Sequence, residues 1–428
     1  MKNFPFFIIL RFRKKAIIVG TIRPGNPDWE VKETLAELAR LTDTAGGEIC
    51  GSIVQEIKRI DSAFFIGKGK AYYLKELAQI KDVDTIIFDD DLSPAQVHNL
   101  EQVIDRKVID RSCLILDIFA KNARTKEAKT QVELAQLEYI LPRLTGHWTH
   151  LSRQVGGIGL KGPGETQLET DRRLIRKRIA KLKSELIKID KQRKTQRKER
   201  KNVFKAILVG YTNAGKSTIL NDLTKADVVV EDRLFATLDS TVRRIPYNNH
   251  QAILLADTVG FIRKLPHHLI ASFRSTLAEI KDANLLLHVV DLSHPSYEKQ
   301  MNSVNEVLNE LNVLTKPVIT LFNKIDLIED EFLISRLKQE FPEAIFISAL
   351  KKIGLGKLIE KMNDYAFGEF YESEVMIPNR NTKLISLIYD TVEVLDREFR
   401  GDLVKLKLKV NNALSKKISK ILEQGNQS

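Results

Sequence analysis

The chain has 428 residues, of which 43% are hydrophobic and 29% charged, and its net charge is +12. This composition is sufficient for several packed cores and excludes an intrinsically disordered protein. Two cysteines without metal-type spacing, Cys50 and Cys113, exclude a disulfide framework and predict a reducing compartment, the cytoplasm.

An apolar run lies near the start of the chain at residues 4–10, and basic residues follow it at 11–15. Its seven residues are too few to cross a bilayer, which takes about 20 residues in a helix. A secretory signal would carry its charges before the apolar run rather than after it. We therefore expect an extension that leads into the first strand, no integral membrane segment, and at most a peripheral association with membranes.

Residues 1–120 alternate short apolar runs with helical patterns, which is typical of an α/β domain. Strands are predicted at residues 16–20, 85–88 and 107–110, with a further apolar run at 49–60. A helix is predicted at residues 29–41, and another should begin at Ser93-Pro94 because proline suits the first helical position. These elements predict one small sheet domain.

Two helical runs follow, the first from about residue 117 to 142 and the second after residue 171. The second run places apolar residues at alternating spacings of four and three: Ile175, Ile179, Leu182, Leu186 and Ile189. That seam is typical of helix-on-helix packing. We therefore predict a long helical hairpin over residues 121–201.

The segment that joins the two runs contains five glycines among the ten residues 156–165. Glycines cost backbone entropy and add no packing, so a structural role alone explains them poorly. A flexible linker, a phosphate cradle and a loop that approaches a large partner closely remain as interpretations. The cradle is the weakest of the three, because no strand and no lysine-serine pair accompany the segment.

The basic character of the protein is concentrated in residues 172–205, where sixteen lysines and arginines face three acids. The rest of the chain is close to neutral. A helix of this charge is attracted to phosphate backbones, and with few aromatic residues it would recognise RNA by shape and charge. A solvated helix face is the alternative, but such a face normally carries both signs of charge.

Residues 202–368 show a doubly wound pattern, with strands near residues 206–209, 252–256, 285–290, 318–322 and 344–347 and helices between them. Residues 369–428 are predicted to form a small α/β appendage with a strand at 403–410 and a helix that reaches residue 422. The whole chain is therefore assigned to the α/β class.

A phosphate-loop motif directly follows the strand at residues 206–209. Gly210 and Gly215 let backbone N–H groups turn inward around phosphates, and the following helix points its positive end at them. Lys216 should reach the β and γ phosphates, and the Ser217 hydroxyl should ligate Mg²⁺. The expected nucleotide contacts are Gly210, Tyr211, Thr212, Asn213, Ala214, Gly215, Lys216, Ser217 and Thr218.

A switch segment is predicted twenty residues beyond Ser217, around Thr237. The threonine hydroxyl would give Mg²⁺ a second protein ligand only while the γ-phosphate is present. An ordinary loop residue is the alternative for Thr237. The segment comprises Phe235, Ala236, Thr237, Leu238 and Asp239.

A second switch is predicted where Asp257 follows the strand at residues 252–256. This carboxylate can hold Mg²⁺ through water, and the backbone N–H of Gly260 can bind the γ-phosphate. The motif is Asp257, Thr258, Val259 and Gly260. Lys216, Thr237 and Gly260 are thus the expected catalytic groups.

Phe261 stands where many GTPases place a glutamine that orients the attacking water. Its ring can neither donate nor accept a hydrogen bond, so slow unassisted hydrolysis and stimulation by a partner are expected. The alternative is that the ring only packs.

Guanine specificity is predicted from Asp326. Its carboxylate accepts hydrogen bonds from the N1–H and the 2-amino group of guanine, and adenine offers neither donor. GTP and GDP are therefore the expected substrate and product. The residues expected around the base are Asn323, Lys324, Ile325, Asp326, Ser348, Ala349 and Leu350.

With these motifs the chain resembles the HflX family of ribosome-associated, translation-factor-related GTPases. The resemblance rests on residues 66–70, 131–137, 156–169 (GGIGLKGPGETQLE), 235–239 and 257–261. It implies an amino-terminal α/β subdomain, a two-helix coiled coil, a Ras-like G domain and a variable carboxyl-terminal part. It also implies binding to the large ribosomal subunit, with the glycine-rich loop reaching ribosomal RNA. Ser240 and Val242 depart from the family pattern, which bears on the geometry of the switch.

The favoured hypothesis is a monomeric GTPase that binds the large ribosomal subunit and acts in ribosome splitting, rescue or biogenesis. Its RNA contacts would be the glycine-rich loop and the basic helix. An RNA-binding P-loop ATPase or kinase is a second hypothesis, which Asp326 and Thr237 oppose. The third is a regulatory GTP-binding protein that has no ribosomal partner.

Overall fold

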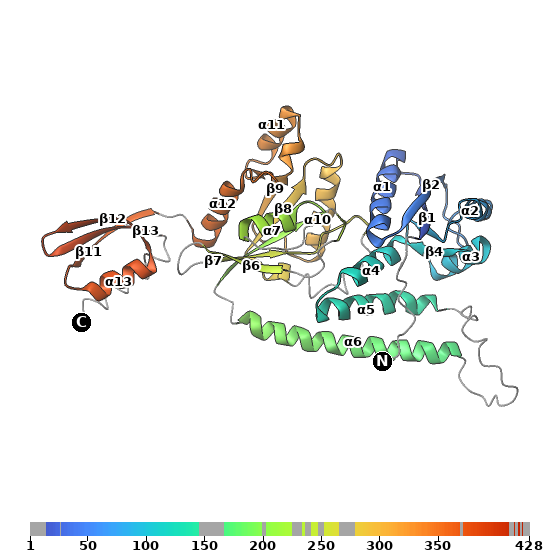
Figure 1. The fold of residues 1–428 in the computed structure, drawn as a ribbon, viewed down its shortest axis with the longest axis horizontal. Helices are drawn as coiled ribbons and strands as arrows, with labels where there is room; N and C mark the ends of the chain where they lie inside the picture. The colour runs from blue at the N-terminus through green and yellow to red at the C-terminus, as the bar shows by residue number, and fades with distance from the viewer. Residues whose placement is uncertain are drawn as a thin grey trace. The chain divides into compact units, whose positions relative to one another are not determined.

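The computed structural model describes residues 14–25, 27–144, 167–198, 203–224, 233–235, 241–246, 252–264, 279–368 and 371–410, with a few positions beyond (Figure 1). The chain forms two compact units. The first is Met1–Lys198 with Glu231–Asp239 and Lys264–Thr276, and the second is Glu199–Val230, Ser240–Arg263 and Leu277–Ser428. The predicted boundaries at residues 120, 201 and 368 stay a prediction.

The first unit contains a parallel sheet of strand order β2-β1-β3-β4. Its strands are β1 (Lys15–Ile22), β2 (Glu48–Glu56), β3 (Thr85–Phe88) and β4 (Lys107–Asp110). Its helices are α1 (Asp28–Ala45), α2 (Lys68–Ile80), α3 (Pro94–Ile104) and α4 (Arg111–Asn122). The apolar strands are buried between the helices, and α2 and α3 pack on one side of the sheet around Phe88 and Leu100.

The start of α3 illustrates how local sequence determines an element. The Ser93 hydroxyl accepts a hydrogen bond from the Gln96 N–H, and the Gln96 side chain accepts one from the Ser93 N–H. Pro94 occupies the first helical position, where its missing N–H costs nothing. The helix therefore begins at the residue that the sequence predicted.

A helical hairpin completes the described part of the first unit. Its helices are α5 (Lys126–Ile140), which continues into the short η1 (Leu141–Arg143), and α6 (Gln167–Lys198), and the two run antiparallel (Figure 1). Ile175 and Leu182 are 3% and 1% exposed, which confirms the predicted seam. Arg178 makes a bidentate ion pair with Glu133 of α5 at 2.6 and 2.7 Å. The glycine-rich residues 156–165 and residues 1–13 lie outside the described part.

The single helical run predicted from residue 117 to 142 is wrong, because the chain forms two helices there. Ala123 adopts an extended conformation and ends α4. The Thr125 hydroxyl then accepts a hydrogen bond from the Ala128 N–H and caps α5. The short polar interruption was hidden by the apolar residues on both sides.

The second unit contains a sheet of strand order β10-β9-β8-β5-β7-β6, parallel except for β6. The strands are β5 (Phe204–Gly210), β6 (Thr241–Pro246), β7 (Ala252–Asp257), β8 (Leu285–Asp291), β9 (Val318–Asn323) and β10 (Ile345–Phe346). The helical elements are α7 (Lys216–Thr224), α10 (Tyr297–Glu310), η3 (Ile325–Leu327), α11 (Glu331–Glu340) and α12 (Leu355–Phe367). The predicted doubly wound class is confirmed, and β6 is an antiparallel edge strand that was not predicted.

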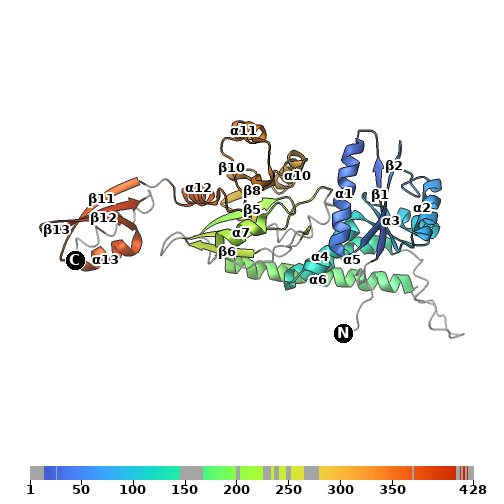
Figure 2. The ribbon, with the colours of Figure 1, turned by 45° about the horizontal axis from the view of Figure 1, so that its top comes forward.

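A small antiparallel sheet of order β11-β13-β12 ends the described chain, with α13 against one face (Figure 2). Its elements are β11 (Tyr371–Pro378), α13 (Thr382–Thr391), β12 (Glu393–Arg400) and β13 (Leu403–Val410). The predicted strand at residues 403–410 coincides with β13. Val404, Leu406 and Leu408 form part of a separate core, whereas the lysines between them lie on the other face.

In the described part of the chain, no helix combines the length and the apolar character that crossing a membrane requires.

Candidate functional site

Polar residues and a glycine turn meet at the carboxyl edge of the second sheet. Gly210 ends β5, Asp257 ends β7, Asp291 ends β8 and Asn323 ends β9. The order of the strands reverses around β5, and ligands of open α/β sheets bind where this reversal opens a crevice. This edge is therefore the position for a ligand.

Two positions of the turn after β5 admit only glycine. A Cβ atom on Gly210 would lie 2.3 Å from the carbonyl oxygen of Val289, and one on Gly215 would lie 2.2 Å from Nδ2 of Asn323. Gly215 also has a φ of +96°, which disfavours other residues. The turn is thus held close to β8 and to Asn323, and α7 begins directly after it.

Lys216 is buried inside this turn. Its Nζ donates hydrogen bonds to the carbonyl oxygens of Gly210 at 3.1 Å and Tyr211 at 2.6 Å. Burial lowers its pKa to about 8, and the nearby carboxylate of Asp257 opposes that shift. A buried ammonium group with only dipolar partners is a strong attractor for an anionic ligand.

Ser217 and Asp257 form a pair of oxygen donors beside the lysine. The Ser217 hydroxyl donates to Oδ2 of Asp257 at 2.6 Å. Oδ1 of Asp257 is buried and has no hydrogen-bond partner among the described residues. Burial raises the pKa of Asp257, and the charge of Lys216 acts against that rise. A hydroxyl and a carboxylate with an unsatisfied oxygen fit Mg²⁺, which prefers a few oxygen ligands and water.

The segment after β7 is attached to the phosphate loop through its backbone. The Thr212 N–H donates to the carbonyl oxygen of Phe261 at 2.7 Å, and the Phe261 N–H donates to that of Gly210 at 3.1 Å. A Cβ atom on Gly260 would lie 2.6 Å from Cα of Thr212, so residue 260 must be glycine. The Phe261 ring is 2% exposed.

Asn323 connects the base loop with the phosphate loop and with the segment after β10. Its Nδ2 donates to the carbonyl oxygen of Ala214 at 2.8 Å, and its Oδ1 accepts from the Ala349 N–H at 3.0 Å. The two amide atoms therefore hold the phosphate loop and the segment after β10 in one arrangement. The side chain of Asp326, which follows on the same loop, is exposed to solvent.

Two residues of this edge were missed from the sequence. Asp291 accepts a hydrogen bond from Nζ of Lys324 at 2.6 Å. This ion pair holds the lysine of the predicted base loop in place. Its position directly after a buried strand, like that of Asp257, was the available signal. His288 lies inside β8, where burial lowers its pKa to about 4, with a contribution from Lys216. The imidazole is therefore neutral, and no pattern in the sequence distinguished it from a core residue.

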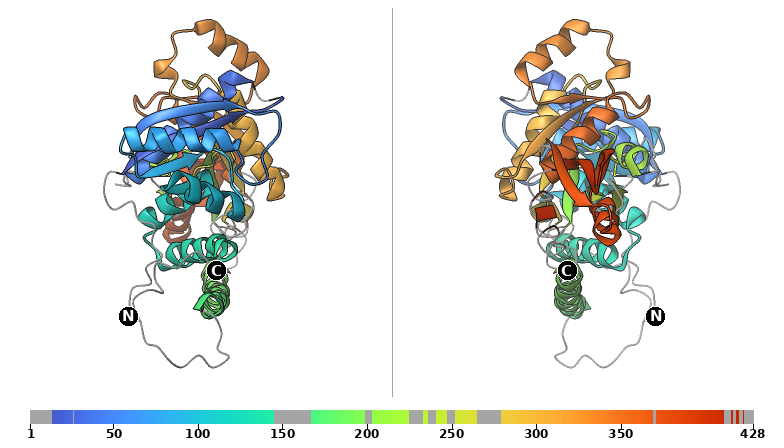
Figure 3. Two further views of the ribbon diagram at one scale, coloured as in Figure 1. Left: turned by 90° about the vertical axis from the view of Figure 1, so that its right-hand side faces the viewer. Right: turned by 90° about the vertical axis from the view of Figure 1, so that its left-hand side faces the viewer.

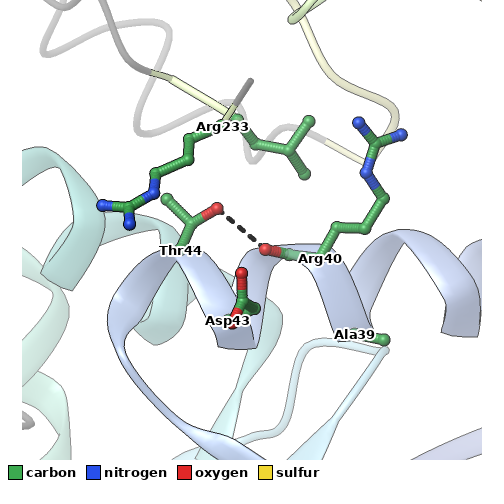
Figure 4. Close-up of a pocket in the computed structure, with 6 residues that line it drawn as sticks. Ala39, Arg40, Asp43, Thr44 and Arg233 are labelled. Atoms are coloured by element: carbon green, nitrogen blue, oxygen red, sulfur yellow. Dashed lines mark hydrogen bonds between the residues drawn. The ribbon is translucent and has the colours of Figure 1, made fainter. Parts of the chain in front are cut away.

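The first predicted switch is described only at its start. Phe235 packs edge-on against Phe119 with ring centroids 4.8 Å apart, and its carbonyl oxygen accepts from Nδ2 of Asn122 at 2.7 Å. Ala236, Thr237, Leu238 and Asp239 lie outside the described residues. Just before Phe235, Arg233 and Leu234 face α1 across a cavity of about 340 Å³ (Figure 4).

Three family models match the chain in consecutive order. Residues 32–120 match the GTP-binding GTPase N-terminal family, and residues 122–200 match the GTP-binding GTPase Middle Region. Residues 205–324, which contain the phosphate loop and the base loop, match the family described as 50S ribosome-binding GTPase.

Relatives that carry the name GTPase HflX cover most of the chain. The Flavobacterium psychrophilum protein is 51% identical over 73% of this chain and 76% of its own length. The Caldanaerobacter subterraneus protein is 43% identical over 96% and 94%, and the Escherichia coli protein is 44% identical over 86% and 87%. A GTP-binding protein from Sulfolobus solfataricus, solved with GDP, is 28% identical over 82% of this chain and 98% of that chain, with a TM-score of 0.44. The chain therefore belongs to the HflX family of GTPases, and it binds and hydrolyses GTP.

Proposed function

We propose that this GTPase acts on the ribosome, binding the large subunit in its GTP form and serving in ribosome splitting, rescue or biogenesis. The contacts to ribosomal RNA would be the glycine-rich residues 156–165 and the basic face of α6. The observation that carries the proposal is the distribution of charge on the hairpin, in a chain whose G region matches the 50S ribosome-binding GTPase description.

Two groups of described basic residues on α6 differ in their partners. Arg178 and Lys183 pair with Glu133 and Glu138 of α5, so they hold the hairpin together. Others are exposed and have no carboxylate partner in the described part of the chain: Arg176, Lys177, Lys181 and Lys188. Cations left unneutralised along one helix supply the electrostatic attraction to a phosphate backbone that RNA binding needs.

We assign the nucleotide contacts as follows. Lys216 exchanges its two carbonyl partners for the β and γ phosphate oxygens of GTP. Gly260 donates its N–H to the γ-phosphate, and the exposed Asp326 reads the guanine edge. Ser217 and Thr237 would hold Mg²⁺ directly and Asp257 would hold it through water. The ion would neutralise the phosphate charge that grows during hydrolysis.

In the hydrolysis step a water oxygen forms a bond to the γ-phosphorus, and the bond between that phosphorus and the β–γ bridging oxygen breaks. The water loses a proton, which passes to an oxygen of the released phosphate. Lys216 and the backbone N–H groups of the loop stabilise the negative charge that collects on GDP. The side chain of Phe261 cannot orient the water, so the unassisted rate is slow and the partner completes the site. Loss of the γ-phosphate then releases Gly260 and Thr237, which ends binding to the partner.

The same proposal places the protein in the cytoplasm, where ribosomes are. It also treats the protein as a monomer, because all the proposed nucleotide contacts come from one chain. The family membership opposes the ATPase or kinase alternative. A regulatory GTP-binding protein without a ribosomal partner remains as the outcome of a failed test.

GTP turnover measured with and without purified large ribosomal subunits tests this proposal. We expect subunits to raise the turnover rate at least tenfold, and we expect no turnover from Lys216→Ala under either condition. Co-sedimentation should show the protein pelleting with large subunits in the presence of a non-hydrolysable GTP analogue but not with GDP. Absence of both stimulation and pelleting would favour the non-ribosomal regulator.

A further inference from the structure

Helix α2 exposes basic and aromatic side chains on the side that it turns away from its sheet. Its buried side, formed by Ala71, Leu74 and Ala78, packs into the core of the first unit. The left view of Figure 3 shows α2 in front of that sheet. On the outer side, Tyr72 and Tyr73 expose 48% and 47% of their surface. We call the exposed residues Gly67, Lys68, Gly69, Tyr72 and Tyr73, together with the half-buried Lys70, the α2 surface.

Gly69 has no reason within the fold to be a glycine. It lies in the first turn of α2 and is absent from the residues with positive φ. A Cβ atom built on Gly69 would meet no atom within 4 Å, and the same is true of Gly67. Alanine is more favourable than glycine at an exposed helical position. The bare backbone is explained when another molecule approaches it closely.

Among the described residues, no carboxylate pairs with the two lysines of the α2 surface, Lys68 and Lys70. Nζ of Lys70 instead lies 4.4 Å from the centre of the Tyr73 ring, so this ammonium group is held over an aromatic face. The carboxylate in the preceding turn, Asp61, accepts the N–H groups of Ala63 and Phe64. The surface therefore offers two cations to an anionic partner.

Lysines interleaved with exposed tyrosines and a bare backbone match the chemistry of RNA. Phosphate oxygens can approach the lysines and the Gly69 backbone, and bases can stack on the tyrosine rings. An acidic protein would satisfy the lysines, but it would leave the exposed rings and the missing Cβ atom unexplained. We propose that the α2 surface binds ribosomal RNA, as a contact separate from the glycine-rich loop and α6. This inference rests on the proposed function, because it requires binding to the large subunit.

A double substitution and a matched control test the role of the lysines. Lys68→Gln with Lys70→Gln should weaken binding of the full-length protein to large subunits about tenfold, and should lower the salt dependence by about two phosphate contacts. Lys405→Gln with Lys407→Gln removes the same charge from β13, where these lysines pair with Glu374 and Glu372. Equal affinities for the two double variants would overturn the inference.

Gly69→Ala tests the close approach of the partner. Alanine favours the helix, so the melting temperature should stay the same or rise while binding to large subunits weakens about tenfold. Gly356→Ala is the control, because Gly356 holds the same first-turn position in α12 and also has open space at its Cβ position. Wild-type affinity of the Gly69→Ala variant would show that nothing approaches this backbone and would overturn the inference.

A photoreactive phenylalanine analogue in place of Tyr72 identifies the partner. Crosslinks to ribosomal RNA are expected, and crosslinks to a ribosomal protein alone would overturn the inference and assign the surface to a protein. Tyr72→Ala should weaken binding about fivefold, which is the lower range for stacking on one base. Failure of the wild-type protein to bind subunits would contradict the proposed function itself. Wild-type binding that survives the lysine substitutions would contradict this inference alone.

Discussion

The two larger sheets of the protein both place carboxylates at the ends of parallel strands, and these carboxylates have opposite roles. In the second unit, one buried oxygen of Asp257, beside the phosphate loop, has no hydrogen-bond partner among the residues that the structure describes. In the first unit, Arg111 pairs with both Asp89 and Glu37, and Asp110 accepts from Tyr139 and Arg143. A carboxylate at a strand end therefore marks a ligand site where the fold leaves its hydrogen bonding incomplete.

The first sheet edge is filled by cations of its own unit. Lys264 pairs with Asp89 and Asp90, and Arg23 also pairs with Asp90 at 2.9 Å. The pKa of Asp89 is lowered, because the charges of Arg111 and Lys264 outweigh the effect of its burial. The cations at this edge are already neutralised by carboxylates, so they are not available to a phosphate group and the edge disfavours a phosphate-bearing ligand.

The largest effect is expected from a change in the base specificity of the site in the second unit. Asp326→Asn should weaken GTP binding about a thousandfold and create binding of xanthosine triphosphate, because the amide can donate to the xanthine 2-oxygen that replaces the guanine amino group. Calorimetric titration with both nucleotides measures the change. The exposed position predicts an unchanged melting temperature, and an unchanged preference for GTP would contradict the assignment of Asp326.

At the edge of the first sheet, where the carboxylates are paired, loss of a partner should destabilise the fold. Arg111 is 1% exposed, and Arg111→Met leaves Asp89 and Glu37 without their common partner. We expect the free energy of unfolding to fall by about 3–5 kcal/mol, because removing one member of a buried ion pair strands the other charge. Denaturant unfolding measures it, and Arg111→Met combined with Asp89→Asn and Glu37→Gln should recover part of the loss. Full stability of the single variant would contradict a structural role.

At the edge of the second sheet, loss of the Asp257 charge should not destabilise the fold. Asp257→Asn is expected to leave the unfolding free energy without nucleotide unchanged or about 1 kcal/mol higher, because the buried carboxylate is incompletely partnered. GTP hydrolysis should still fall about a hundredfold, as expected for a group that orients a metal-bound water. Asp89→Asn is the matched control, which should lower stability. Destabilisation of both variants to the same extent would erase the contrast between the sheets.

A pH-dependent effect is expected at Asp117 on α4, whose Oδ2 atom is buried and has no hydrogen-bond partner among the described residues. Burial raises its pKa from 3.8 to about 7, with Lys107 acting in the opposite direction. The folded protein keeps this proton up to about pH 7 while the unfolded chain releases it near pH 4, so stability falls as the pH rises through that range.

Asp117→Asn removes this dependence. The variant should be more stable than the wild type by up to about 4 kcal/mol above pH 7, and the two should converge below pH 4. Urea unfolding at several pH values measures the difference. A constant difference across this range would show that the carboxyl group does not titrate as described.

The sequence predicted best those elements whose apolar run and boundary signals agree. The bounds of β3, β4 and β13 match the predicted strands, and α3 begins at its predicted cap. Strand β6 was missed because Arg243, Arg244 and Pro246 interrupt the apolar pattern of an edge strand. Strands β11 and β12 were missed because they carry many charges, and the pairing of the β11 acids with lysines of β13 is a tertiary effect.

At the proposed nucleotide site, too, local motifs were predicted and tertiary contacts were not. Lys216, Ser217 and Asp257 lie together as their motifs predicted. Asn323 was predicted only as a residue around the base, and its two hydrogen bonds were not predicted, because the partners of an amide depend on the packing of separate strands. His288 carried no local signal, since its environment is created by residues distant in sequence.

The hydrophobic clusters around β1, around β5 and around β13 are separate from one another. Heat should therefore melt this protein in more than one calorimetric transition, and a single melting temperature would not describe it. GDP stabilises only the cooperative block to which it binds, by about 2.7 kcal/mol at a hundred times its dissociation constant. The transition whose melting temperature rises with GDP identifies the part of the protein that contains the site, without any substitution.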